Sequence, residues 1–207
     1  MDLDQIKLSF EKPDGGYAFA RWNRPIAPVI FGVTGESLPV LKGAIEAVAK
    51  LAGVDVQETD PELGSNCMMF FLSEWDELTA TKDMDRLVPD LKTVVSRLKE
   101  ANAAQYRFFR YDKEGGIMAA FLFMRATDNL TQQPAEVIAL TNAVQIILTW
   151  GSKAFDAGSP LGLHPENKAV VLKPEYADVI RAAYDPVMPI CANDDSHALR
   201  LAARVSQ

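Results

Sequence analysis

The sequence has few of the residues from which metal centres are usually built. Its 207 residues include only two histidines, His164 and His197, and they lie far apart in the chain. A zinc peptidase needs two histidines one helical turn apart and a glutamate that activates water, and the chain has no such pattern. Acidic partners could in principle complete a zinc site, but surface histidines are the more ordinary interpretation. We therefore expect no metal and no cofactor.

Cysteine is equally scarce, with only Cys67 and Cys191 in the chain. A cysteine nucleophile needs a neighbouring histidine to stabilise its thiolate. Cys67 lies in an apolar run, where a thiolate would be disfavoured. Cys191 is close to His197 in sequence, but Cys191 precedes a helix that His197 begins. We therefore expect no cysteine nucleophile. Two cysteines suffice for one disulfide, but spacing alone does not show whether they meet. Two free thiols that pack as small hydrophobic groups are the alternative.

Several other signals are absent. The glycine pairs 15–16 and 115–116 lie in turns without the context of a phosphate-binding loop, and no G-x-S-x-G elbow occurs. No run of basic residues offsets the net charge of −7, which argues against nucleic acid as a partner. No apolar stretch reaches the ~20 residues of a membrane span. The first 12 residues lack the apolar core of a signal peptide, which is expected of a cytoplasmic protein, a mature form or a trimmed chain.

The residues that are present predict a folded domain. The chain is 48% hydrophobic, and its length fits one domain over residues 1–207. The central feature is an apolar strand at 117–124, then a polar hinge at 125–133, then a long apolar helix from Pro134 to Trp150. Strands and helices mix early and helices dominate later. The fold class we expect is α+β, with one mixed sheet, helices packed on it and a central buried helix near 134–150.

Hydrophobic periodicity and turn residues divide the rest of the chain. Residues 3–10 could form a helix or a strand. The expected strands are an edge strand at 26–33 with Pro28, a short strand at 54–57, a central strand at 67–72, and a hairpin of 105–111 with 117–124. The expected helices cover 38–52, a segment after Ser73, 91–98, 175–184 and 197–205. Residues 161–167 look irregular, and 169–172 could be a short strand.

The polar hinge is the best position for a pocket. Asn142 and Gln145 are three residues apart on the following helix, so both could reach the same space. Arg125 from the hinge and His164 complete the candidate ligand-binding residues. The amides could instead satisfy nearby backbone groups, which is the plainer interpretation. The acidic residues Glu74, Asp76, Glu77, Asp83 and Asp85 are typical of a solvated helix face or cap, with a weak divalent-cation site as the alternative.

Three segments together resemble a known family. They are Arg-Trp-Asn-Arg-Pro-Ile at 21–26, Gly-Ser-Asn-Cys-Met-Met-Phe-Phe-Leu at 64–72, and Ala-Ala-Tyr-Asp-Pro at 182–186 with the last helix around Ala198. Their order and spacing resemble an uncharacterised bacterial family, known as a domain of unknown function, that is similar in layout to zincin-like metallopeptidases. The resemblance covers about residues 4–206. It implies a zincin-like fold and, because relatives often carry export signals, a periplasmic setting.

The chain departs from this family at its central helix. Family members carry paired glutamates and a glutamine there, whereas this helix reads Ala-Leu-Thr-Asn-Ala-Val-Gln-Ile-Ile at 139–147. Gln145 matches the family glutamine, or the register is shifted by two. The departure implies a degenerate site with no catalytic residue, and so a non-catalytic domain that binds a protein or a small ligand.

Two alternatives remain open. One is a metal-dependent hydrolase with an atypical site that uses Glu136 or His164. The other is a structural partner in a cell-envelope complex, for which exposure of Trp22, Trp75 or Trp150 would be a sign.

Overall fold

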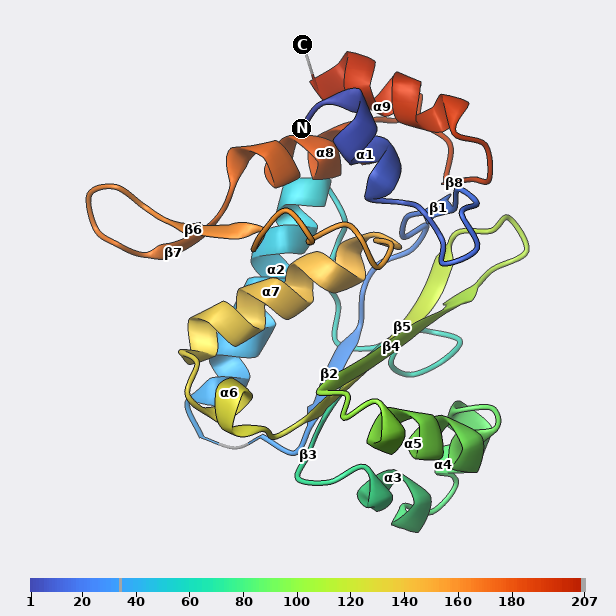
Figure 1. Cartoon of the computed structure of the whole chain (residues 1–207), viewed down its shortest axis with the longest axis vertical. Helices are drawn as coiled ribbons and strands as arrows, with labels where there is room; N and C mark the ends of the chain where they lie inside the picture. Colours follow the sequence, from blue (N-terminus) through green and yellow to red (C-terminus); the bar gives the residue numbers. More distant parts are fainter. Residues whose placement is uncertain (34, 206–207) are drawn as a thin grey trace.

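The computed structural model describes residues 1–33 and 35–205, and over these residues it has an α+β fold (Figure 1). The helices are α1 (Leu3–Leu8), α2 (Ser37–Ala52), α3 (Asp76–Ala80), α4 (Met84–Leu87), α5 (Leu91–Glu100), α6 (Asp128–Thr131), α7 (Ala135–Ile147), α8 (Pro174–Ala183) and α9 (Ser196–Val205). The strands are β1 (Phe19–Ala20), β2 (Pro28–Phe31), β3 (Cys67–Leu72), β4 (Gln105–Tyr111), β5 (Ile117–Arg125), β6 (Leu161–Leu163), β7 (Val170–Leu172) and β8 (Cys191–Ala192).

Four strands form a mixed sheet in the order β2-β3-β5-β4. β2, β3 and β5 are parallel, and β4 returns antiparallel to β5 as the expected hairpin. The continuous apolar runs of β3 and β5 occupy the two central positions, as expected for strands covered on both faces. β2 lies at the edge, where Pro28 removes no hydrogen bond from the ladder.

The sheet separates two hydrophobic cores, and β5 contributes to both. Ala120, Leu122 and Met124 face the larger core, which includes α2 and α7, whereas Phe121 and Phe123 face the smaller core under α3 and α5. Figure 1 shows α2 and α7 on one side of the sheet and α3, α4 and α5 on the other. This alternation of neighbouring residues decides which side chains of β5 can reach α7.

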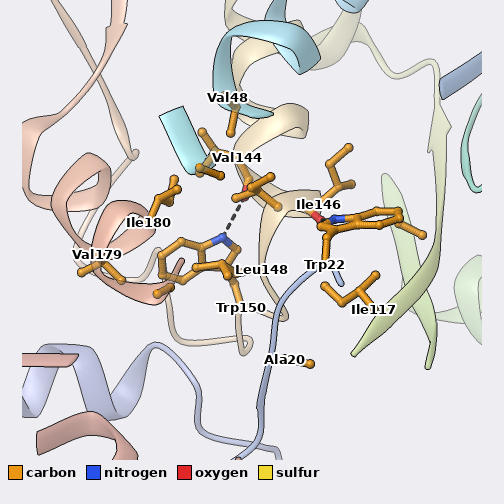
Figure 2. Close-up of a cluster of buried hydrophobic side chains, with 14 of the residues drawn as sticks. Ala20, Trp22, Val48, Ile117, Val144, Ile146, Leu148, Trp150, Val179 and Ile180 are labelled. Carbon is orange, nitrogen blue, oxygen red and sulfur yellow. Dashed lines mark hydrogen bonds between the residues drawn. The ribbon is translucent and has the colours of Figure 1, made fainter. Parts of the chain in front are cut away.

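The central helix ends three residues before the expected Trp150, in the middle of the larger core. The last four carbonyls of a helix lack partners within it. In α7 each of them accepts a hydrogen bond from a different side chain: Trp150 Nε1 to Val144 O (2.7 Å), Arg107 Nη1 to Gln145 O (2.7 Å), Trp22 Nε1 to Ile146 O (2.8 Å) and the Tyr184 hydroxyl to Ile147 O (2.7 Å). Figure 2 shows the two indole rings beside this end of the helix. Leu148 is already extended and bridges to Arg21.

Two local predictions were wrong. Residues 161–167 are not all irregular, because Leu161–Leu163 pairs with Val170–Leu172 as the hairpin β6–β7. Each of these strands has only three residues, too short for a reliable periodic pattern. The expected strand at 54–57 contributes only a bridge between Val56 and Ile26. Residues 3–10 resolve as a helix, α1, whose Asp2 and Gln5 form a capping box.

Both cysteines are free thiols. Cys67 is buried in β3, where burial raises the pKa of its thiol to about 12. Cys191 is half-buried in β8, and its Sγ donates to Glu114 O at 3.2 Å. Within residues 1–33 and 35–205, no helix is long and apolar enough to cross a membrane.

Candidate functional site

A cavity of about 200 Å³ lies where α6 and the first half of α7 meet the end of β5 and the start of β4. We call it the amide pocket. It is lined by Ala104, Gln105, Met124, Thr127, Asn129, Leu130, Gln133, Ile138, Thr141 and Asn142. Four of these residues carry a carboxamide and none carries an ionisable side chain. Thr127 caps α6 by accepting from Leu130 N, and this turn folds the polar hinge over the pocket.

Asn142 is the most deeply buried of the pocket's amides, with 3% of its surface exposed. Its Nδ2 donates to Ile138 O at 2.7 Å and contacts Met124 Sδ at 3.0 Å, which fixes the orientation of the side chain. Its Oδ1 accepts no hydrogen bond from any residue that the structure describes. The Oδ1 is not among the fully buried atoms without a partner, so this largely buried amide presents an accessible acceptor at the wall of the cavity.

Gln145 lies one turn further along α7 and acts on the pocket through Gln105. Gln105 Nε2 donates to Gln145 Oε1, and this hydrogen bond holds the side chain of Gln105 in place at the pocket wall. Arg107, two residues along β4, donates to Gln145 O and also to Trp150 O at 3.1 Å. Burial lowers the pKa of Arg107 to about 10, which leaves the guanidinium charged at neutral pH. Its charge meets the partial negative charge of the α7 C-terminus.

Arg125 does not share this space, contrary to our expectation. It follows Met124 on β5 and therefore points to the opposite face of the sheet. There it donates to Asn102 Oδ1 at 2.7 Å and lies 3.8 Å from Glu74 Oε2. It joins the end of α5 to the segment before α3, which is a structural role.

His164 is also separate from the amide pocket. It lies in the turn of the β6–β7 hairpin, where its Nδ1 accepts from Glu166 N at 3.4 Å and its backbone bonds Ala169 and Lys168. This hairpin projects from the body of the molecule (Figure 1). Its hydrogen-bond partners all come from its own hairpin.

His197 was expected at the surface, and that prediction was wrong. It is 3% exposed, it shares a 2.8 Å hydrogen bond between Nδ1 and the Tyr17 hydroxyl, and its ring packs on Phe19. It begins an amphipathic helix, α9, whose inner face packs against α1 and α8. The apolar periodicity of α9 could have predicted that His197 is buried, because His197, Ala198 and Leu201 lie on the same face of the helix.

The acidic residues near α3 act as caps and surface ion pairs. The carboxylate of Glu77 accepts from Ser73 N and Glu74 N, Asp76 pairs with Lys99, and Asp83 pairs with Arg86. In the described part of the chain, no group of three or more His, Cys, Asp or Glu residues could hold a metal ion.

The pocket is partly what the sequence predicted. The hinge, Asn142 and Gln145 were expected to face one space. Asn142 and the hinge residues Thr127, Asn129 and Gln133 do line the amide pocket, whereas Gln145 does not. Gln105 was missed. Its signal was an uncharged polar residue at the first position of a strand whose other residues are aromatic or arginine.

A larger hollow of about 540 Å³ lies between α1, the 153–158 segment and the start of α8. Its charged residues include Lys153, whose ammonium pairs with Glu11 at 2.8 Å, and exposed Asp156. The amide pocket, by contrast, is lined by the Oδ1 of Asn142, to which no described residue donates. Comparisons of the chain with protein-family models, with curated proteins and with solved structures found no match.

Proposed function

We propose that this chain is a non-catalytic binding domain whose amide pocket holds a small uncharged group with N–H or O–H donors. The observation that carries the proposal is the free Oδ1 of the buried Asn142. A donor placed there would give this acceptor a hydrogen-bond partner, because no described residue bonds it and it reaches the open space of the pocket. The occupant can be a side chain of a partner protein or a small molecule of the same chemistry.

The charge of the pocket favours a neutral occupant. None of its lining residues could neutralise a buried carboxylate or ammonium, and an unpaired charge is expensive to bury. Met124, Leu130 and Ile138 supply apolar surface for a short carbon chain. A cavity of about 200 Å³ has the volume of roughly seven water molecules, which suits a primary amide or alcohol with a few carbons.

The proposal also accounts for the residues that differ from the zincin-like family on α7. In a zincin-like layout, α7 would be the helix that carries the paired glutamates of the family that the chain resembles. Thr141, Asn142 and Gln145 stand on it here, and its only acidic residue is Glu136 in the first turn. We propose that the site became a binding pocket for neutral groups when these acids were replaced by an alcohol and amides.

The two alternatives receive less support. An atypical hydrolase would use Glu136 or His164, yet neither lines the amide pocket, and His164 bonds only within its own hairpin. An envelope partner would expose aromatic residues, yet Trp22, Trp75 and Trp150 are all buried.

The test is an NMR titration of the ¹⁵N-labelled protein with propionamide, and with the charged propionate and propylammonium for comparison. We expect propionamide to shift the side-chain amide signals of Asn142 and Gln105 in a saturable way, and each charged analogue to bind at least tenfold more weakly. Asn142→Leu keeps the volume and removes the acceptor, so it should weaken propionamide binding by at least tenfold.

The matched control is Asn193→Leu, which changes an exposed asparagine outside the pocket. It should bind propionamide as the unaltered protein does. Equal binding by the Asn142→Leu protein, or preferential binding of propionate, would contradict the proposal.

A further inference from the structure

A second cavity, of about 280 Å³, combines basic and acidic groups and is separate from the amide pocket. We call it the Arg21 pocket. Residues 21–25 form one part of its lining and residues 52–55, at the end of α2, form another, with Tyr184 completing it. The hydrogen bond from Ile26 N to Asp55 O, at 2.8 Å, joins the two segments at one end.

Arg21 has a charge with no acidic partner. Within the described part of the chain it makes no ion pair; its Nη2 donates to Met188 O at 3.2 Å, and its buried Nε has no acceptor. Arg24, by contrast, is paired with Glu62 at 3.0 Å and with Asp60 at 3.7 Å. Arg21 is therefore the side chain in this pocket that can pair with an anion.

The position of Arg21 is set before any ligand arrives. Its guanidinium lies over the ring of Tyr184, 5.3 Å from the ring centre. Tyr184 is itself fixed, because its hydroxyl donates to Ile147 O and accepts from Trp22 N at 3.1 Å. A stacked, oriented guanidinium matches the planar geometry of a carboxylate.

The second segment has the opposite charge. Asp55 is exposed and makes no ion pair with the residues that the structure describes. It follows the C-terminal end of α2, whose 16 residues direct a partial negative charge toward the same place. A doubly charged anion would be repelled here, whereas an ammonium group would be attracted.

From these two charged parts we propose that the Arg21 pocket binds a small zwitterion of the α-amino acid class. The carboxylate pairs with Arg21, and the ammonium group lies toward Asp55 and the end of α2. The cavity has the volume of roughly nine water molecules, which leaves room for a small amino acid. This site is independent of the amide pocket, so either can fail without the other.

Titration with glycine, acetate, methylammonium and inorganic phosphate, monitored by NMR of the full chain, tests the proposal. Glycine should produce saturable shifts at the backbone amides of residues 21–24 and 53–55. Acetate, methylammonium and phosphate should each bind at least fivefold more weakly, because each engages one part of the pocket only. No saturable glycine shift, or phosphate binding as tight as that of glycine, would overturn it.

Two variants separate the charges. Arg21→Gln should weaken glycine binding at least tenfold, and Asp55→Asn should reduce glycine binding to the level of acetate. Since Asp55 is exposed, Asp55→Asn tests the proposal even if Arg21→Gln impairs folding. Arg86→Gln and Asp85→Asn make the same changes away from the pocket and should leave glycine binding unchanged. Unchanged glycine binding in Asp55→Asn would overturn the proposed zwitterion.

Discussion

Among single residues, Asn142 and Arg125 show what a sequence does and does not reveal about a site. Helical spacing placed Asn142 and Gln145 on one face of the helix. The direction of Arg125 depended on which face of β5 meets α7. β5 is apolar on both faces, so its pattern has no polar side that identifies the solvent face. The neighbours Met124 and Arg125 thus look equivalent until the helices are placed.

His197 is a second residue whose environment has a measurable consequence. Burial, with a smaller contribution from Arg200, lowers the pKa of His197 to about 4, so the folded protein holds it neutral. The nearby groups are the Tyr17 hydroxyl, Arg200 on α9, and the ion pair of Lys7 with Asp195. A charged imidazole here would have no acidic partner in direct contact among the described residues.

We predict that His197 makes the protein acid-sensitive. Its folded pKa lies below its ordinary value of 6.5, so its contribution to stability is complete above pH 6.5 and is lost as the pH falls toward 4. The loss would total about 3 kcal/mol. Urea unfolding between pH 7 and 4 measures it, and His197→Gln, which titrates no proton, should show a smaller decrease. Parallel curves for the two proteins would contradict this assignment.

At the level of secondary-structure elements, the start of α7 was predictable and its end was not. Pro134 is a local signal for the start of a helix, and the hairpin, α2 and β3 were recognised from equally local patterns. The end of α7 has no glycine cap. Three of its four terminal carbonyls are satisfied by Trp22, Arg107 and Tyr184, which are distant in sequence. Such long-range caps leave no signal in the helix itself.

We predict that Trp22→Phe destabilises the end of α7 specifically. The change removes the donor to Ile146 O in a buried environment and should cost ~1–3 kcal/mol. Hydrogen exchange at the end of α7 should become faster. Trp75→Phe is the matched control, because its indole donates to Ala103 O under the other face of the sheet. If hydrogen exchange at the end of α7 is no faster in Trp22→Phe than in Trp75→Phe, the Trp22 hydrogen bond does not stabilise this helix end.

For the molecule as a whole, the α+β class and the mixed sheet followed from the order of elements along the chain. The burial of both sheet faces also followed, because β3 and β5 are continuous apolar runs. The small sheet of β1 with β8 did not, because each strand has two residues and they lie at opposite ends of the sequence. Both proposed pockets form between segments that only this long-range packing brings together.

The central claim is that α7 lines a binding pocket for a neutral donor group. A crystal structure determined with propionamide present tests it most directly. We predict that the propionamide amide lies within 2.7–3.2 Å of Asn142 Oδ1, a normal hydrogen-bond distance, with its carbons against Met124 and Ile138. An amide pocket closed by its own side chains at saturating propionamide, with the Asn142 Oδ1 bonded inside the protein, would contradict the claim.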